Sequence, residues 1–337
     1  MTPEGSAAGL RVAVDAMGGD DAPDAIVRGA ALAVRDGVPV LLVGDTARIT
    51  PLLPDDVQIP IVHAPEVVEM EEAAALSVRR KTESSIRVGL QLVADGKALA
   101  MVSCGHTGAS FVGAVLVLGV LDTVERPAIA TVLPRSDGGQ LILLDIGANV
   151  DCKPEQLACF AQLGAAWAEV RGVENPRVGL LSNGEEGSKG NEQVRAAHPL
   201  IAASGVHFVG NMEPSAAFAG ACDVLVCDGF VGNVLVKGVE GAAEVVQHLL
   251  REHIKSSVTA RAGALLMRGA FTRFQNQVRW DAHGGGVFLG TKGVVVVGHG
   301  RANAEAVHAA ICAAHRVATG GLVASLQSRL SAQSKSA

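Results

Sequence analysis

The stretch from Val178 to Gln193, VGLLSNGEEGSKGNEQ, determines how the rest of this chain is interpreted. It opens with an apolar run that stops abruptly at Ser182, a pattern that predicts a buried strand leaving a sheet. A loop with three glycines and Lys189 follows, and a helical pattern begins at Asn191. Free backbone N–H groups and the positive end of a helix dipole meet at such a junction, so the stretch predicts an anion-binding loop. The spacing does not fit a Walker A loop, and an ordinary turn with a solvated lysine is the competing interpretation.

The composition limits the classes of protein to which the chain can belong. It has 337 residues, 49% of them hydrophobic and 18% charged, which is enough for a large core in one or two domains. A formal net charge of -6 and the lack of tyrosine argue against nucleic acid as a partner. Six cysteines without a CxxC pair indicate reduced core thiols, and no apolar run is long enough to span a bilayer. A cytoplasmic protein is therefore expected.

Short apolar segments alternate with helical patterns along most of the chain. Strands are expected at residues 10–14, 39–43, 59–63, 98–103, 128–133, 140–144, 178–181, 206–209, 224–227 and 294–297, and the expected helices include one at 75–94 and one at 154–170. Such alternation predicts an α/β fold with a mostly parallel sheet and helices on both of its faces. Ligands in such sheets bind beyond the carboxyl ends of the strands.

Glycines, amides and carboxylates gather at five of these expected strand ends. They comprise Asp15, Gly18 and Gly19; Gly105, His106, Thr107 and Gly108; Asp145, Gly147 and Asn149; Asn183, Gly184 and Lys189; and Asp228, Gly229, Gly232 and Asn233. Glycines let a ligand approach the backbone closely. We therefore expect the five ends to meet at one edge of the sheet and to form one polar, phosphate-sized site.

Six motifs at these positions carry a resemblance to a known family. They are VAVDAMGGDDAP, SCGHTGA, LLDIGANVDCKPE, GLLSNGEEGSKGNE, DVLVCDGFVGNVLVK and the late GHG. From about residue 10 to 320 the chain resembles the phosphate acyltransferases of bacterial phospholipid synthesis, the PlsX type. Two segments depart from the family pattern. This chain has SCGHTGA where the family has SAGNTGA, so that His106 replaces an amide, and it has GGGVFLG where the family has GGAPLLG.

The resemblance implies a fold, a reaction and partners. The fold would be a Rossmann-like three-layer α/β/α sandwich, related to phosphate acetyltransferases and isopropylmalate dehydrogenases and usually a homodimer. The reaction would convert fatty acyl carrier protein and inorganic phosphate to acyl phosphate, which a further enzyme uses to acylate glycerol 3-phosphate. No metal or other cofactor is implied, so Asp15, Asp20, Asp145 and Asp228 are expected to brace loops rather than to hold Mg²⁺.

Three side chains are the candidates for catalysis. Lys189, with the loop amides around Gly187 and Gly190, would hold phosphate and the developing negative charge. Asn233 would donate to the phosphate or to the carbonyl oxygen, with a plain helix cap as the alternative. His106 would act as a base or assist the leaving thiolate, whereas Cys104 is expected to be a packed cysteine rather than a nucleophile. The substrate-binding candidates are Gly18, Gly19, Gly105, Thr107, Gly108, Asn149, Asn183, Gly184, Gly187, Gly190 and Gly232.

A basic amphipathic segment at about 256–282 is expected to protrude from a single domain that spans 10–325. Arg268, Phe271, Arg273 and Phe274 would contact an anionic membrane surface or the acidic carrier protein. A dimer-interface helix is the alternative. Residues 1–9 and 328–337 are expected to be flexible ends.

Three other functions remain open from the sequence. The first is a short-chain phosphate acetyl- or butyryltransferase that uses acyl-coenzyme A. The second is a nicotinamide-dependent dehydrogenase, which is disfavoured because no GxGxxG follows the first strand. The third is a non-catalytic membrane scaffold that recruits lipid enzymes.

Overall fold

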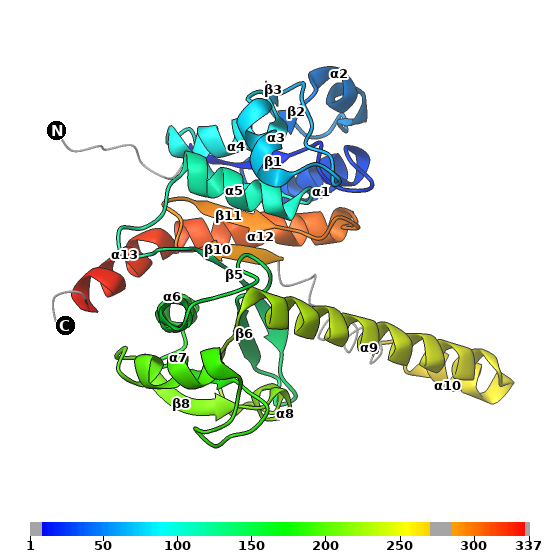
Figure 1. Cartoon of the computed structure of the whole chain (residues 1–337). Helices are drawn as coiled ribbons and strands as arrows, with labels where there is room; N and C mark the ends of the chain where they lie inside the picture. Colours follow the sequence, from blue (N-terminus) through cyan, green and yellow to red (C-terminus); the bar gives the residue numbers. More distant parts are fainter. Residues whose placement is uncertain (1–8, 270–284, 334–337) are drawn as a thin grey trace.

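The strands form one sheet in the order β3-β2-β1-β4-β11-β10-β5-β6-β9-β7-β8. The computed structural model describes residues 9–269 and 285–333 (Figure 1). The strands are β1 Arg11–Asp15, β2 Val40–Gly44, β3 Ile61–His63, β4 Ala98–Ser103, β5 Ala128–Pro134, β6 Gln140–Leu144, β7 Arg177–Leu181, β8 His207–Met212, β9 Val224–Val226, β10 Gly286–Leu289 and β11 Val294–Val297. The helices are α1 Asp24–Arg35, α2 Thr46–Ile49, α3 Ala74–Arg80, α4 Ser85–Ala94, α5 Thr107–Val117, α6 Pro154–Val170, α7 Glu192–Ala202, α8 Pro214–Phe218, α9 Gly229–Lys255, α10 Val258–Leu266, α12 Ala304–Thr319 and α13 Leu322–Gln333.

Helices cover both faces of this sheet, which makes three layers. Alternate strand residues point to opposite faces, so that Val12 and Val14 pack beneath α1 and α12 while Ala13 faces the other side. The first face carries α1, α12, α13, α6 and α7, and the second carries α3, α4, α5, α8 and the first turns of α9. The expected α/β/α sandwich with a mostly parallel sheet is confirmed.

The parallel strands run in two blocks of opposite direction. One block is β3-β2-β1-β4-β11, and the other is β6-β9-β7-β8. Between them β10 pairs antiparallel with β11 and β5, and β5 pairs antiparallel with β6. The expectation that five strand ends point to one edge is therefore wrong, because the β5–β6 hairpin reverses every later strand of the second block.

The two blocks are staggered, and this stagger brings their carboxyl ends to the same level of the sheet. A single row of paired residues runs across both blocks: Val14, Val102, Val296, Val287, Ala130, Leu144, Val226 and Leu180. In β1, β4, β11, β6, β9 and β7 the member of this row is the last or the second-last residue of its strand. The strand ends thus meet at the centre of the molecule, approaching from opposite directions.

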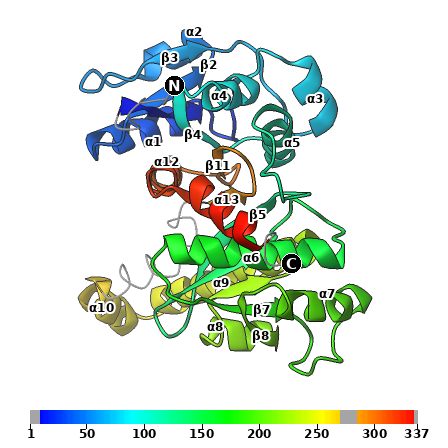
Figure 2. The same cartoon turned by 90° about the vertical axis from the view of Figure 1, so that its left-hand side faces the viewer.

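Helix α9 begins at this centre and then leaves the body of the protein. Its buried residues are Gly229, Gly232 and Val236, all in its first turns, and its later turns pack against α10. Figures 1 and 2 show α9 and α10 as a helical hairpin that projects beyond the sheet. The hairpin therefore includes the C-terminal part of α9 as well as α10.

Three local expectations need correction. The single helix expected near 75–94 is two helices, α3 and α4, and strand β10 was not expected at all. Residues 328–333 belong to α13 rather than to a flexible end, because Leu322, Leu326 and Leu330 recur every fourth position and are buried against the core. Within the described ranges no single helix is long and apolar enough to cross a bilayer. The pair formed by α12 and Leu322–Ser331 of α13, bent by 48° between them, has the required length and composition.

Candidate active site between the two strand blocks

Asp145, directly after β6, organises the loop where the two blocks meet. Its carboxylate accepts hydrogen bonds from the backbone N–H groups of Ile129, Gly147, Ala148 and Asn149, and from the Asn149 side chain. Burial raises the pKa of this carboxyl, and these hydrogen bonds act in the opposite direction. Asn149 is itself buried and also donates to the carbonyl of Pro127 at 2.8 Å. The structure thus gives Asn149 a bracing contact, where the sequence analysis expected substrate binding.

Gly232 fits beside this loop because it has no side chain. A Cβ atom there would lie 1.9 Å from the carbonyl oxygen of Asp145, and one at Gly229 would lie 2.6 Å from that of Asn149. These glycines let α9 begin directly against the Asp145 loop, which is the close approach of two backbones rather than of a ligand. Asp228 caps the same helix by accepting from the N–H of Val231 at 2.9 Å.

Asp15 has the equivalent place at the end of β1. It is buried, accepts from the Ser103 hydroxyl at 2.7 Å and from the N–H of Met17 at 3.0 Å, and burial raises its pKa. A Cβ atom at Gly18 would lie 2.8 Å from the Cα of Gly105. The expected bracing role is confirmed for Asp15, Asp145 and Asp228.

His106 caps α5 with both of its ring nitrogens engaged. Nδ1 accepts from the N–H of Ala109 at 3.2 Å, and Nε2 lies 3.0 Å from the carbonyl oxygen of Glu72, to which it donates. A carboxamide offers the same pair of functions, one acceptor and one N–H donor, on a shorter side chain. This explains how histidine occupies the place of an amide, and it makes His106 a positioning residue for the start of α5.

Glu72 fastens the segment that leads to this contact. Its side chain accepts from the Ser77 hydroxyl at 2.6 Å and pairs with Lys81, whose Nζ also donates to the carbonyl of Val67 at 2.6 Å. The hydrogen bond from Lys81, followed by that from Ser77, lowers the pKa of Glu72 to about 2. Met70, two residues before Glu72, lines the cleft between the two strand blocks.

A cleft of about 580 Å³ opens where the two blocks meet. Gly105, Thr107, Gly108 and Asn233 line it, as the sequence analysis expected. It is also lined by residues that the sequence analysis did not single out as site residues: Asp20, Lys237, Glu240, His299 and Arg301. The spacing of Asn233, Lys237 and Glu240 places the three on one face of α9, a signal that was readable in the sequence. The N-terminus of α5, Lys237 and Arg301 can attract an anion to this cleft, whereas Asp20, which lies 4.0 Å from Arg301, and Glu240 add negative charge to the same lining.

The loop that follows β7 and carries Lys189 (residues 182–191, the lysine loop) lines a second cavity, of about 700 Å³, on another face of α9. Asn183 accepts from the N–H of Gly190 at 2.9 Å, which closes the loop, and Gly190 has a φ of +90°. The side chain of Asn211 holds the same loop by donating to the carbonyl of Glu186 at 2.8 Å. Lys189 is exposed and packs near Gly184. Asn183 and Gly190 face this second cavity, whereas Asn233 faces the cleft, so the two principal candidates do not line one common cavity.

The remaining expected site residues have other surroundings. Gly19 has a φ of +119° and lies against the carbonyl oxygens of Gly300 and Cys104, whereas Gly187 is exposed beside His198. Arg268 is exposed just beyond α10. Phe271, Arg273 and Phe274 lie outside the described residues.

Cys104 is packed rather than reactive. It is 2% exposed, and burial, with a smaller effect of the Asp15 charge, raises the pKa of its thiol to about 12. A thiolate is the reactive form of cysteine, so this thiol is not suited to attack an acyl group at neutral pH.

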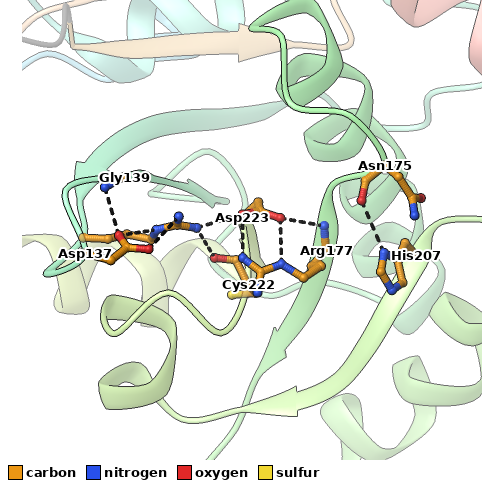
Figure 3. Close-up of polar contacts among 8 residues, drawn as sticks. Asp137, Gly139, Asn175, Arg177, His207, Cys222 and Asp223 are labelled. Carbon is orange, nitrogen blue, oxygen red and sulfur yellow. Dashed lines mark hydrogen bonds and ion pairs between the residues drawn. The ribbon is translucent and has the colours of Figure 1, made fainter.

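The opposite end of the second block carries a cluster of paired charges. Asp223 accepts from Arg135 at 2.8 Å and from the guanidinium of Arg177 at 2.9 and 3.0 Å (Figure 3). Arg135 also pairs with Asp137 and donates to the carbonyl of Cys222. Burial opposes ionisation of Asp223, but the hydrogen bonds from Arg177 and Arg135 outweigh it and lower its pKa to about 2. This cluster joins the β5–β6 hairpin to β7 and β9, and each of its charges has a partner within it.

Comparison with known proteins identifies the family of the chain. Residues 10–324 match the model of a family described as "Fatty acid synthesis protein". A phosphate acyltransferase of Desulforudis audaxviator is 45% identical over 319 residues, covering 94% of this chain and 95% of its own length. One from Thermus thermophilus is 47% identical over 325 residues, covering 96% of this chain and 99% of its own. The chain belongs to the phosphate acyltransferase family.

Solved structures agree with the fold of this family member. A phosphotransacetylase of Streptococcus pyogenes superposes with a TM-score of 0.63 at 18% identity, covering 92% of this chain and 95% of its own. A branched-chain phosphotransacylase of Enterococcus faecalis gives 0.56 at 16% identity, covering 91% of this chain and 99% of its own. These likenesses concern the fold alone. Membership of the family makes this phosphate acyltransferase an enzyme of acyl transfer to phosphate in fatty acid and phospholipid synthesis.

Proposed function

We propose that this enzyme transfers a fatty acyl group from acyl carrier protein to inorganic phosphate. The observation that carries the proposal is the cleft at the meeting point of the two blocks. There the N-terminus of α5, Lys237 and Arg301, which also lies 4.0 Å from Asp20, supply positive charge beside Asn233, in a space large enough for phosphate.

The reaction needs no group beyond the two substrates. An oxygen of hydrogen phosphate attacks the thioester carbonyl carbon, the new C–O bond forms, and the C–S bond breaks. The leaving thiolate takes the proton of the hydrogen phosphate, so that acyl phosphate and a free thiol result. Holding the two reactants in line supplies much of the acceleration, because it converts a bimolecular step into a unimolecular one.

Lys189 and Asn233 have separate roles in this proposal. Asn233 lies in the cleft and donates a hydrogen bond to the phosphate or to the carbonyl oxygen. Lys189 is exposed and forms no ion pair with the residues that the structure describes, so its ammonium group can turn toward the start of α9. There it stabilises the negative charge that develops in the transition state.

The projecting hairpin is the proposed contact for the partners of the reaction. Val258, Leu265 and Leu266 of α10 are exposed, Leu266 by 89%, and Arg261 and Arg268 add positive charge beside them. Exposed apolar groups with basic neighbours suit an anionic membrane surface or an acidic carrier protein. We propose a cytoplasmic enzyme that associates peripherally with the membrane and passes its product to a glycerol 3-phosphate acyltransferase. Exposed Val245, Val246 and Leu249 of α9 support a homodimer.

An assay of purified protein tests the reaction and its acyl donor together. Palmitoyl carrier protein and inorganic phosphate are supplied without added metal, and acyl phosphate is trapped with hydroxylamine as the hydroxamate. We expect turnover with the carrier-protein thioester to exceed that with acetyl-coenzyme A by at least tenfold in kcat/KM. Preference for acetyl-coenzyme A would indicate the short-chain enzyme instead. Vesicle binding without turnover on either donor would indicate the membrane scaffold.

The hairpin is tested separately by charge reversal. Arg261→Glu together with Arg268→Glu should weaken binding to vesicles that contain anionic lipid, more at low salt than at high salt, because surface charges are screened. Activity on a small acyl-coenzyme A should change little, since the cleft is unaltered. Unchanged binding to both vesicles and carrier protein would remove this role from α10.

A further inference from the structure

The second cavity has walls that are mostly apolar, unlike the charged cleft on the other side of α9. Its volume is about 700 Å³, which lies within the range of pockets for small organic ligands. The wall is built from Leu157 of α6, Leu181 at the end of β7, Val194 of α7, and Val231 and Leu235 of α9. Leu157 and Leu181 are buried, whereas Val231 is 37% exposed, so the cavity has a closed apolar side and an open side along α9.

One buried polar group in this cavity has no partner. Ser182 is 9% exposed, and its hydroxyl oxygen makes no hydrogen bond with any residue that the structure describes. Leaving a buried hydroxyl unpaired costs free energy, so such groups are exceptions that call for an explanation. A ligand that brings its own acceptor to Ser182 would remove this cost.

Each of the other polar side chains of the cavity gives one oxygen to a backbone N–H group, and Asn183 and Asn191 are exposed. Asn183 accepts from the N–H of Gly190, Asn191 accepts from that of Val194, and Asp228 accepts from that of Val231. A ligand with many polar groups, such as a pantetheine arm with its amides, would find few buried partners here. A ligand with a long apolar body and one polar end matches the walls and the single free hydroxyl.

We infer that this cavity holds the acyl chain of the substrate, with the carbonyl end at Ser182. The inference rests on the proposed function, since it names the place of the acyl chain in that reaction. It also gives the two cavities distinct tasks. The cleft with Asn233, Lys237 and Arg301 takes the anion, and the cavity beneath the lysine loop takes the hydrocarbon, so that the two substrates approach the start of α9 from its two sides.

The test is a change of chain-length preference on filling the cavity. Val231→Trp places an indole in the space of the chain, and each methylene that it displaces costs about fourfold in affinity. We expect kcat/KM for a palmitoyl thioester to fall at least tenfold more than that for a butyryl thioester, because the short chain does not reach the part of the cavity that the indole fills. Leu200→Trp is the matched control, because Leu200 is 38% exposed on neighbouring α7 and does not line the cavity. It should leave both values unchanged.

A binding measurement separates the place of the chain from turnover. The fluorescent fatty acid cis-parinaric acid should bind the parent protein, be displaced by palmitate, and bind the Val231→Trp variant at least tenfold more weakly. Ser182→Ala should lower kcat/KM about ten- to a hundredfold for palmitoyl and butyryl donors alike, because a hydrogen bond to the carbonyl end is lost at either length.

Three results would overturn the inference. The first is an unchanged chain-length profile in an active Val231→Trp variant that binds cis-parinaric acid normally. The second is an equal loss on both donors together with a change of oligomeric state, since a second copy of the chain would then occupy the cavity. The third is full activity of Ser182→Ala on both donors. Failure of the proposed function is distinguishable, because it would appear as no acyl phosphate from the parent protein with any donor.

Discussion

The two ends of the block β6-β9-β7-β8 lie only a few residues apart along each strand, yet in the described part of the chain the polar groups are paired at one end and partly unpaired at the other. At the amino-terminal end Asp223 is surrounded by Arg135 and Arg177, and every charge has a partner (Figure 3). At the carboxyl end Ser182 has an unpaired buried hydroxyl, and Lys189 forms no ion pair with the residues described. The first end is complete within this chain, and the second keeps polar groups for the ligand that we propose.

This difference separates residues that hold the block together from residues that act on substrates. Removing a member of the paired cluster should lower stability and spare catalysis. Removing a member of the open end should lower catalysis and spare stability. A variant that shows the opposite pattern would contradict this division.

The largest effect is expected for Lys189→Ala. Loss of one preorganised group that stabilises developing charge typically costs about 10²–10³ in rate. We expect a loss of that size in kcat, with an unchanged thermal midpoint because Lys189 is exposed. Steady-state acyl-phosphate formation and circular dichroism measure the two quantities. Lys292→Ala, at an exposed lysine that pairs with Asp122, is the control and should retain full activity. A Lys189→Ala variant within threefold of the parent would remove the assigned role.

Asp223→Ala should have the converse effect. The change leaves Arg135 and Arg177 without their shared carboxylate, and we expect about 2–3 kcal/mol less stability, because Asp223 is 14% exposed while Arg177 is partly open to solvent. Urea unfolding measures this loss, and kcat should stay within twofold. Asp137→Ala removes a more exposed partner of the same Arg135 and should cost much less stability than Asp223→Ala, because solvent screens an exposed pair. A large loss of kcat in a stable Asp223→Ala variant would contradict the division between the two ends.

The contribution of Asp223 should also depend on pH in a defined window. Its pKa is lowered to about 2 in the folded protein from an ordinary value of 3.8. A lowered folded pKa means that the stabilisation is fully present above pH 3.8 and is lost as the pH falls through about 2. The difference in unfolding free energy between parent and Asp223→Ala should therefore shrink between about pH 4 and about pH 2. A difference that stays constant over this window would show that Asp223 does not act through its charge.

The sequence predicted individual elements well where apolar runs have clear limits. The strands at 98–103 and 140–144 and the helix at 154–170 appear at the same residues in the structure. Pro154 marks the start of that helix, and the charged Asp145 marks the end of the apolar strand 140–144. Such signals are local, so one sequence suffices to read them.

The relative direction of the blocks depended on one short connection. Residues 135–139, between β5 and β6, are too few for a crossover between parallel strands, so they form a hairpin that reverses the strands after it. The short connection favours a hairpin, whereas the alternation of strands and helices by itself predicts one strand direction throughout. The four-residue β10 was missed because so short a segment carries no clear period.

The residue types of the candidate site were predictable, but their division between two cavities was not. Which side of α9 a residue faces depends on the rotation of that helix in the fold, so Asn233 and Lys189 were expected in one site although their surroundings line two cavities. The unpaired hydroxyl of Ser182 could not be read from sequence at all. The hydroxyl is buried because Ser182, at the end of β7, packs beside Gly190 of the lysine loop, and this contact exists only in the folded chain.

His106 should have a smaller effect that depends on the replacement. His106→Asn keeps one acceptor for the N–H of Ala109 and one donor toward the carbonyl of Glu72, so activity within about threefold of the parent is expected. His106→Ala removes the helix cap and should cost about 1 kcal/mol of stability together with a higher KM for phosphate. Thermal unfolding and phosphate titration measure both. An inactive but fully folded His106→Asn variant would mean that the imidazole itself takes part in the reaction.

The smallest effect on catalysis is expected for Cys104→Ser. Cys104 follows β4, directly before the loop that lines the cleft, so its position alone resembles that of a nucleophile. Its surroundings assign it to the packed class: a Cβ atom at Gly298 would lie 2.5 Å from its sulfur, and burial raises the pKa of the thiol to about 12. A thiol that stays protonated at neutral pH does not attack the thioester, which agrees with the direct attack by phosphate that we propose. We expect kcat within twofold of the parent, a modest loss of thermal stability from the buried hydroxyl, and no acyl-enzyme in mass spectra of the parent protein during turnover. Loss of activity in a folded Cys104→Ser variant, together with an acyl group trapped on Cys104 of the parent, would replace direct attack by a two-step mechanism and move this residue to the reactive class.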